Sequence, residues 1–320
     1  MNFLLMFVLL SSSESWSQSL IKDNLKKIDQ VHGDIKSGWS TMNKSVDKFF
    51  ATKSYEEEIN ESYIRMNLLT QVVDGGPTTT VYGLRLQTDF PNTSKSVKLI
   101  IKKEGESFGD GDGQGESLGL INSNTRRGAS GQNLSEALED TSYSAAGRLD
   151  FLRDKRWNLY TDLGFRFTVP LDPFVKVRVR RRFSFTKKSI LDVIQKLEYF
   201  RVNEQSHETV FEYKYALSKK LRLQFTNLFS YRKLDHFYHF SHNLSLLHVY
   251  KRTTSFAYSV AAGGESEPVY AYNNYSVATQ MRRLIHKDWL FFQISIGANF
   301  PRTEDFNARG FVTAGLEVFF

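Results

Sequence analysis

The chain of 320 residues contains no cysteine. This absence excludes a disulfide scaffold, a cysteine-based zinc site, a thiol nucleophile and a lipoprotein anchor. Long apolar runs are missing as well. Nowhere do 18 uncharged apolar residues follow one another, so the chain is not a bundle of transmembrane helices. With only 6 Pro and 20 Gly, the composition is otherwise that of an ordinary folded protein.

Aromatic side chains, in contrast, are abundant. They make up 14% of the chain, with 26 Phe and 15 Tyr. The mean hydropathy of -0.39 is that of a soluble protein. It is also compatible with a membrane β-barrel, because only every second residue of each strand then faces lipid. The aromatic content favours the barrel.

A short apolar segment opens the sequence. Residues 3–10 are all apolar, and three serines follow them. The segment is too short to span a bilayer but suits the hydrophobic region of a secretory signal, although no Lys or Arg precedes it. Ser15 and Ser17 supply the small residues that signal peptidase reads. We therefore expect a signal peptide over residues 1–17; a buried N-terminal strand or helix is the alternative.

The next segment, residues 21–50, has a heptad pattern of apolar residues. The two rows are Leu25, His32, Trp39 and Val46, and Ile21, Ile28, Ile35, Met42 and Phe49. Such a narrow stripe is typical of a coiled coil or of a helix lying in a groove. Three placements are open: a periplasmic coiled coil that forms a homo-oligomer, a plug in a barrel lumen, or a helix packed on the periplasmic rim. We assign residues 18–58 to this helix and its linker.

Beyond residue 58 the apolar residues alternate with polar ones. The clearest case is the segment from Trp157 to Val169. Its apolar face carries Trp157, Leu159, Leu163, Phe165, Phe167 and Val169. Successive side chains of a strand point to opposite sides, so one face is apolar and the other hydrophilic. This segment is longer than the usual strand of a soluble sandwich, which is the alternative fold.

About fourteen such segments follow one another, an even number as expected of a membrane barrel. They are residues 61–73, 79–90, 96–107, 142–152, 156–168, 174–186, 195–203, 208–218, 220–232, 237–250, 253–263, 269–283, 288–300 and 309–320. We predict that residues 59–320 form an all-β, antiparallel up-and-down transmembrane barrel. Segment 195–203 is the least regular and follows a long turn over 187–194, so twelve strands remain possible.

The connections between these segments alternate in length. The tight polar turns are 91–94, 154–156, 218–220, 251–252 and 286–288, and the longer loops are 108–141, 263–268 and 301–309. Short periplasmic turns and longer external loops are the rule in membrane barrels. Aromatic residues gather near the strand ends, where interfacial girdles are expected. They are Tyr63, Phe90, Tyr143, Trp157, Tyr231, Tyr238, Tyr250, Trp289 and Phe300.

The last segment carries a specific resemblance. Val312, Ala314, Leu316, Val318 and Phe320 alternate on one face, and the sequence ends on that Phe. This pattern resembles the C-terminal signature of bacterial outer-membrane β-barrel proteins, which the assembly machinery of that family reads. The resemblance covers about ten residues and indicates no subfamily. It implies a location in the bacterial cell outer membrane, with membrane lipid and the assembly machinery as partners.

With the apolar face turned to lipid, segment 174–186 directs Lys176, Arg178, Arg180 and Arg182 inward and Arg181 outward. The other basic residues expected on the inner face are Arg65, Arg85, Lys98, Lys102, Arg148, Arg166, Lys214, Arg222, Arg232 and Arg282. The expected acids are Asp89, Glu104, Asp150, Asp162, Glu198, Glu212 and Glu317. Basic residues thus outnumber acids by about two to one.

Basic rings in a water-filled pore favour anions by raising their local concentration. The sequence therefore predicts a porin-like channel for passive diffusion of small anionic solutes, with Arg166 and Arg222 joining the four basic residues of segment 174–186 as pore-lining residues. The alternative is a plugged structural or surface-interaction barrel whose charges pair across the lumen. We predict no catalytic residue and no cofactor.

A His-x-Ser pair gives the only enzymatic hypothesis. His239 and Ser241 share one strand face, an arrangement similar to that of outer-membrane phospholipases and lipid A deacylases, where imidazole activates the hydroxyl for acyl transfer. Those families place the pair toward lipid and follow Ser directly with Asn, whereas His242 follows here. Tyr238 and Phe240 fit the lipid face better, so we expect His239 and Ser241 to point inward.

Two further binding functions are not supported. Residues 109–116 carry three carboxylates spaced as in calcium loops, but no bidentate Glu follows at the full loop spacing, so we predict no metal site. The net charge of +7 does not indicate nucleic-acid binding, because the basic residues are expected on an inner wall rather than in an exposed patch.

Overall fold

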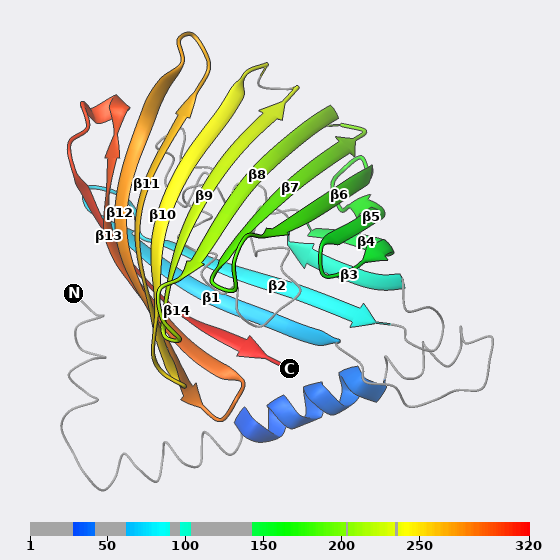
Figure 1. Cartoon of the computed structure of the whole chain (residues 1–320). Helices are drawn as coiled ribbons and strands as arrows, with labels where there is room; N and C mark the ends of the chain where they lie inside the picture. Colours follow the sequence, from blue (N-terminus) through cyan, green and yellow to red (C-terminus); the bar gives the residue numbers. More distant parts are fainter. Residues whose placement is uncertain (1–27, 42–61, 90–96, 104–142, 203, 234–235) are drawn as a thin grey trace, which may run out of the picture.

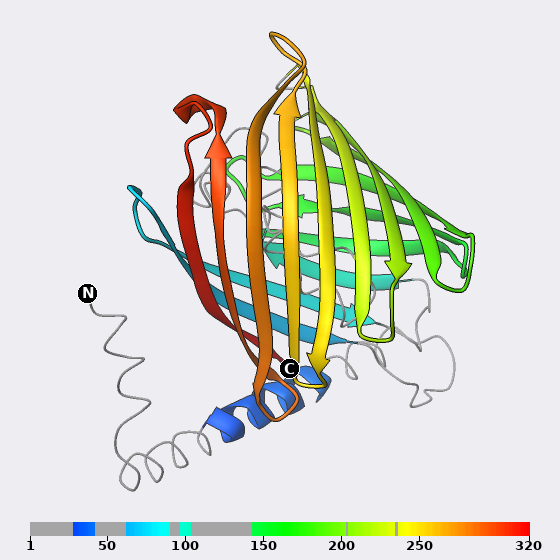
Figure 2. The same ribbon diagram turned by 60° about the vertical axis from the view of Figure 1, so that its left-hand side comes forward.

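The computed structural model describes residues 28–41, 62–89, 97–103, 143–202, 204–233 and 236–320. Its fourteen strands form one closed antiparallel barrel in which sequence neighbours pair and β1 pairs with β14 (Figures 1 and 2). The strands are β1 Tyr63–Val73, β2 Thr79–Asp89, β3 Val97–Lys103, β4 Tyr143–Arg153, β5 Trp157–Arg166, β6 Asp172–Ser184, β7 Ser189–Phe200, β8 Glu204–Ala216, β9 Leu221–Arg232, β10 Tyr238–Lys251, β11 Thr254–Glu265, β12 Ala271–His286, β13 Leu290–Pro301 and β14 Arg309–Phe319, with a 3₁₀ turn, η3, at Arg302–Glu304.

The predicted fold class and strand count are confirmed, and twelve strands are excluded. The predicted long turn over 187–194 is wrong, because β7 already begins at Ser189. A tight turn precedes it, in which the Thr186 hydroxyl accepts hydrogen bonds from the backbone N–H groups of Lys188 and Ser189. Ile194 points inward and packs with Val210 and Leu228. An apolar residue on the inner face breaks the alternation, which explains why this strand is hard to recognise from sequence.

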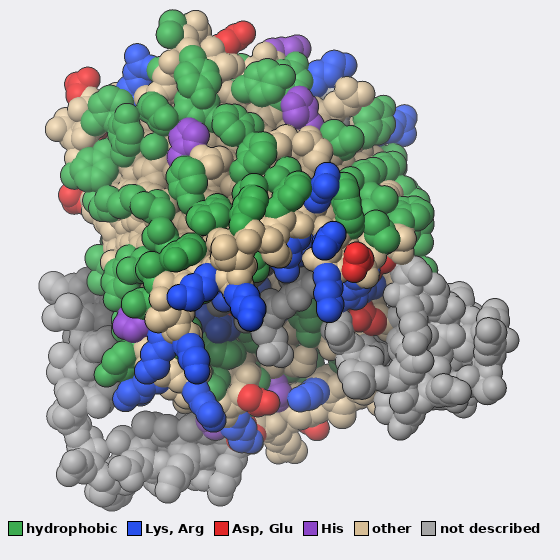
Figure 3. Space-filling view, viewed as in Figure 1, with side chains coloured by type: hydrophobic (Ala, Val, Ile, Leu, Met, Phe, Trp, Pro, Cys, Tyr) green, Lys and Arg blue, Asp and Glu red, His purple; other side chains and the backbone are tan. Residues whose placement is uncertain are grey.

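The two faces of the wall are assigned as expected. On β5, Leu163 and Phe165 are 47% and 50% exposed on the outer surface, whereas Asp162 and Arg166 are buried on the inner face. Hydrophobic side chains accordingly form a broad band on the outside (Figure 3). Since apolar surface exposed over the height of a barrel is stable only against lipid, the strands span a membrane.

The barrel has two distinct ends. The N-terminal helix, residues 28–41, and the C-terminus lie at one end, called here the helix end (Figures 1 and 2). The described turns at the helix end are short, and the described loops at the opposite end, including 302–308, are mostly longer. This difference agrees with the predicted alternation of connection lengths. The predicted loop 108–141 lies outside the described residues.

Residues of β14 close the barrel. Nine residue pairs join β14 to β1, from Arg65–Phe319 to Val73–Phe311. The backbone N–H of Phe320 extends this ladder by donating to the carbonyl of Ile64 at 2.9 Å. Val312 and Leu316 are exposed on the outer surface. Ala314 and Val318 share their face by the two-residue period, while recognition of this strand by an assembly machinery stays a prediction.

The N-terminal helix docks on the rim of the helix end through one buried side chain. The His32 ring stacks on Trp289 at 4.2 Å and on Phe320 at 4.8 Å between ring centroids. Its Nε2 lies 2.7 Å from the carbonyl oxygen of Phe319. The described part of the helix thus takes the rim placement, while Ile28 and Ile35 of the other heptad row are exposed. No helix among the described residues is long and apolar enough to cross a membrane.

An ion-pair contact reinforces this docking. Asp29 lies 2.9 Å from Lys287 Nζ and 2.8 Å from His286 Nε2. The hydrogen bonds from Lys287 and then His286 hold the pKa of Asp29 below its ordinary value. A carboxylate with a lowered pKa contributes above its ordinary pKa and loses its contribution as the pH falls through the lowered one. The contact therefore persists at neutral pH.

We expect Asp29→Asn to loosen the helix from the rim at neutral pH. Hydrogen exchange of the amides of residues 28–41 should become faster in the variant, and wild-type exchange, corrected for intrinsic rate, should accelerate only below about pH 4. Asp34→Asn, an exposed substitution on the same helix, is the control and should leave exchange unchanged. Equal acceleration in both variants would show that helix charge, not the rim contact, matters.

Candidate functional site

The lumen wall is the candidate site, and its charges are unevenly distributed around the barrel. Cross-strand register places a continuous group of charged side chains on the inner faces of β1 to β8. Away from the strand ends, the described inner positions of β9 to β13 are mostly small and polar. They include Thr226, Ser241, Asn243, Ser245, Ser259, Asn274 and Ser295.

A ladder of four basic side chains follows the inner face of β6. Lys176 and Arg178 are buried, at 8% and 7% exposure, and Arg180 and Arg182 continue the row at two-residue spacing. All four lie where the sequence predicts them. Arg181 points outward, with its guanidinium 4.8 Å from the Trp157 ring centroid and 4.6 Å from that of Phe183.

The strand register gives each member of the ladder its cross-strand neighbours. Lys176 is opposite Asp162 on β5 and Glu198 on β7, and Arg182 is opposite Asp192. Arg178 is opposite Tyr160 and Lys196. Arg180 is opposite Asn158 and Ile194.

Buried ion pairs stabilise the wall beside the ladder. Arg148 donates to both carboxylate oxygens of Asp162, at 2.7 and 2.9 Å. Arg166 donates through Nε and Nη2 to Oδ2 of Asp172, which is fully buried. Asp172 also accepts the backbone N–H of Val202 at 2.9 Å. These pairs hold the charged side chains in place, and the bond from Val202 also holds the turn that follows β7.

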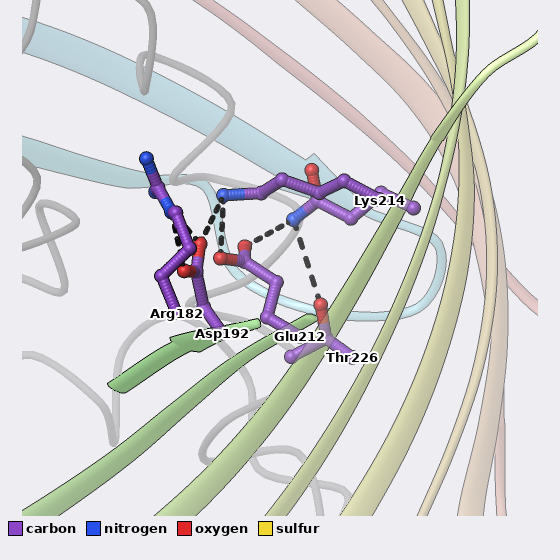
Figure 4. Close-up of polar contacts among 6 residues, drawn as sticks. Arg182, Asp192, Glu212, Lys214 and Thr226 are labelled. Carbon is purple, nitrogen blue, oxygen red and sulfur yellow. Dashed lines mark hydrogen bonds and ion pairs between the residues drawn. The ribbon is translucent and has the colours of Figure 1, made fainter. Parts of the chain in front are cut away.

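A second network runs across β6 to β9. Arg182 donates to Asp192 at 2.7 and 2.9 Å, and Lys214 lies 3.5 Å from the same carboxylate. Lys214 also lies 2.6 Å from Glu212, which accepts a hydrogen bond from Gln224. Figure 4 shows Arg182 and Lys214 converging on Asp192. Arg182 is thus a bridging residue as well as part of the ladder.

Several charged residues of the inner face were not predicted from the sequence, and they change the ratio of basic to acidic residues there. The inner faces carry Arg65, Arg85, Lys98, Lys102, Arg148, Arg153, Arg166, Lys176, Arg178, Arg180, Arg182, Lys196, Lys214, Arg222, Arg232, Arg282 and Arg309 against Asp89, Asp150, Asp162, Asp172, Asp192, Glu198, Glu208, Glu212, Glu265 and Glu317. Among the described residues the ratio of basic to acidic residues is therefore about five to three, not two to one. Asp172 and Asp192 were missed because they fell outside the predicted strands. Glu104 is outside the described residues.

Two residues predicted on the inner face, Arg222 and Arg232, lie near the ends of β9 and are more exposed than the ladder on β6. Arg222 faces inward near the helix end of β9, opposite Ala216 and Leu247, and is exposed. Arg232 is exposed near the other end of the same strand. These two residues belong to the mouths of the lumen rather than to the buried wall.

The His-x-Ser pair points inward as expected. Ser241 is buried on the inner face, and His239 Nδ1 lies 3.5 Å from Glu265. The outward histidine of this strand is His242, whose Nδ1 lies 2.6 Å from Asn227 Oδ1. The cross-strand partner of His242 on β11 is Ala262, which offers no hydroxyl. The geometry required for an acyl-transfer pair toward lipid is not present at these positions.

No group of three or more His, Asp or Glu residues that could hold a metal ion occurs in the described part of the chain. The acidic segment 109–116, considered above as a calcium loop, lies outside the described residues. The structure therefore leaves that segment untested.

Comparisons with known proteins show no family for this chain. No family model matches the chain, and no curated protein sequence matches it. Among solved structures, a loop-deletion form of OmpT, an outer membrane protein of Vibrio cholerae, is 9% identical with a TM-score of 0.45, covering 82% of this chain and 99% of its own. The outer membrane channel DcaP of Acinetobacter baumannii is 7% identical with a TM-score of 0.45, covering 81% and 96%.

A further solved structure, the CymD monoaromatic hydrocarbon channel, is 8% identical with a TM-score of 0.43, covering 88% of this chain and 91% of its own. The closed fourteen-strand topology and the apolar exterior show that the chain is a transmembrane β-barrel. The solute class named for CymD is a property of that protein and is not assigned to this chain.

Proposed function

We propose that the protein is a channel of the bacterial outer membrane through which small anionic solutes diffuse passively. The observation that carries the proposal is the inward basic ladder of Lys176, Arg178, Arg180 and Arg182 on β6, in an inner wall where basic side chains outnumber acidic ones. Fixed positive charge in a pore raises the local concentration of anions and lowers their entry barrier. The protein is not proposed to be an enzyme.

The uncharged half of the lumen supports the same function. Hydroxyl and amide side chains such as Ser241, Asn243 and Ser295 can exchange hydrogen bonds with a hydrated solute without holding its charge. Conduction requires binding that is favourable enough for entry yet weak enough for release. A basic wall facing a neutral polar wall meets both requirements.

A second candidate is a structural or surface-interaction barrel with a closed lumen. The observation that favours it is the set of ion pairs Arg148–Asp162, Arg166–Asp172 and Arg182–Asp192, which hold the side chains of the wall in fixed positions. In that case the wall charges hold the barrel together and the external loops form the working surface.

Single-channel conductance of the refolded mature chain in a planar bilayer separates the two candidates. The channel proposal predicts stable open events and a reversal potential that indicates anion preference. A folded, heat-modifiable barrel that never conducts would overturn it. Chains lacking 109–138 or 21–52 should be recorded in parallel, because conductance that arises only after a deletion indicates a plugged barrel.

A further inference from the structure

A collar of exposed basic side chains lies at the helix end of the barrel, along the turns from β4 to β13. It comprises Lys155, Arg156, Arg181, Lys187, Lys188, Lys219, Lys220, Lys251, Arg252, Arg283 and Lys287, all of which are exposed. These residues come from five successive described turns and the adjoining strand ends. The same turns carry only two acids, Asp154 and Asp288. Figure 3 shows the Lys and Arg side chains gathered at this end, below the hydrophobic band.

The opposite end has no such excess among its described residues. Its basic side chains are Arg201, Arg232, Lys233, Arg302 and Arg309, and its acids are Asp74, Glu265, Glu267, Glu304 and Asp305. Basic and acidic residues are thus balanced there. The net charge of the chain therefore does not explain the collar, which is a property of one end of the barrel.

The collar lies at the level of the aromatic girdle. Arg181, on the outer face of β6, packs its guanidinium over Trp157 and Phe183. Lys251 Nζ lies 5.3 Å from the ring centroid of Tyr250. Aromatic rings mark the interface between the hydrocarbon and the headgroups, and basic side chains beside them extend their charged ends to the headgroup level.

We propose that this collar binds the phosphate groups of anionic phospholipids in the membrane leaflet at the helix end. Lys and Arg near a negatively charged leaflet attract anionic headgroups, and Arg and Lys both bind phosphate oxygens through charge-assisted hydrogen bonds. The collar charges are spread around the circumference instead of converging on one pocket. That distribution suits a shell of several lipids and not a single dissolved anion.

Spin-labelled lipids provide the test. The refolded full chain is placed in phosphatidylcholine bilayers, and the motionally restricted fraction is measured for labelled phosphatidylglycerol and labelled phosphatidylcholine. We expect a preference for phosphatidylglycerol of about threefold to fivefold, falling toward onefold in 0.5 M salt. Equal association of the two lipids with the wild-type chain would overturn the proposal.

Two variants that remove the same number of charges show which end of the barrel causes the preference for phosphatidylglycerol. The collar variant carries Lys188→Gln, Lys219→Gln and Arg252→Gln, and the control carries Arg201→Gln, Lys233→Gln and Arg302→Gln at the opposite end.

All six positions are exposed, so both variants should fold, which heat-modifiability on gels verifies. The collar variant should lose about half of the preference while the control retains it. An equal loss in both variants would also overturn the proposal. Neither result depends on whether the barrel conducts.

Discussion

Replacing Arg178 and Arg180 by serine is expected to lower the anion-to-cation permeability ratio by about threefold to tenfold. Two unit charges 4 Å apart in water interact with about 1 kcal/mol, so the scale of the effect is about a fivefold change in local ion concentration. Both side chains lie at the centre of the basic ladder on the inner wall. The reversal potential across a salt gradient in a planar bilayer measures the ratio.

Arg181→Ser is the matched control for this experiment. It removes the same charge from the same strand one residue away, but from the outer face beside Trp157. Its permeability ratio should equal that of the wild type. If the double variant retains its anion preference, or if Arg181→Ser changes the ratio equally, the ladder on β6 does not select the permeating ion.

Replacing Glu317 by glutamine is expected to lower the free energy of unfolding more than the other substitutions proposed for this protein. Glu317 is fully buried, and its carboxylate accepts hydrogen bonds from Arg282 at 2.8 Å and pairs with Arg65. Loss of the carboxylate leaves two largely buried guanidinium groups without their counter-ion, which costs about 3–5 kcal/mol. Because Arg65 is on β1 and Glu317 on β14, the loss occurs at the closing seam of the barrel.

The free energy of unfolding from urea titration in lipid vesicles, followed by tryptophan fluorescence, measures this loss. Glu208→Gln is the matched control, because its partner Lys196 is on the adjacent strand and the Glu208 side chain is 24% exposed. A partly solvated pair contributes only about 0–1 kcal/mol. Similar losses in the two variants would show that Glu317 has no special role in closing the barrel.

The barrel itself was predictable because alternation is a local property. A residue two positions along a strand returns to the same face, so Leu163 and Phe165 reveal a lipid face without any knowledge of their neighbours. The inward direction of Lys176 to Arg182 follows from the same rule. Prediction failed at β7, where the inner face carries Ile190 and Ile194 and the chain no longer alternates between apolar and polar residues.

Ion pairing was not predictable, because it depends on cross-strand register. Arg182 and Asp192 are ten residues apart and Arg65 and Glu317 are 252 residues apart, yet both pairs form when strands align. The same holds for the helix. Its heptad predicts two apolar rows, but the contact of His32 with Trp289 and Phe320 depends on where the barrel closes.

The sequence by itself determined that this chain is a barrel of about fourteen strands with an apolar outside and a basic inside, since period-two alternation needs no tertiary information. Only the tertiary structure decided which inner charges form the ion pairs described above. It also placed the helix on the rim and arranged basic turns that are far apart in sequence as one collar. The physical reason is that register and closure, which determine all these contacts, arise from pairing between strands and not from any single strand.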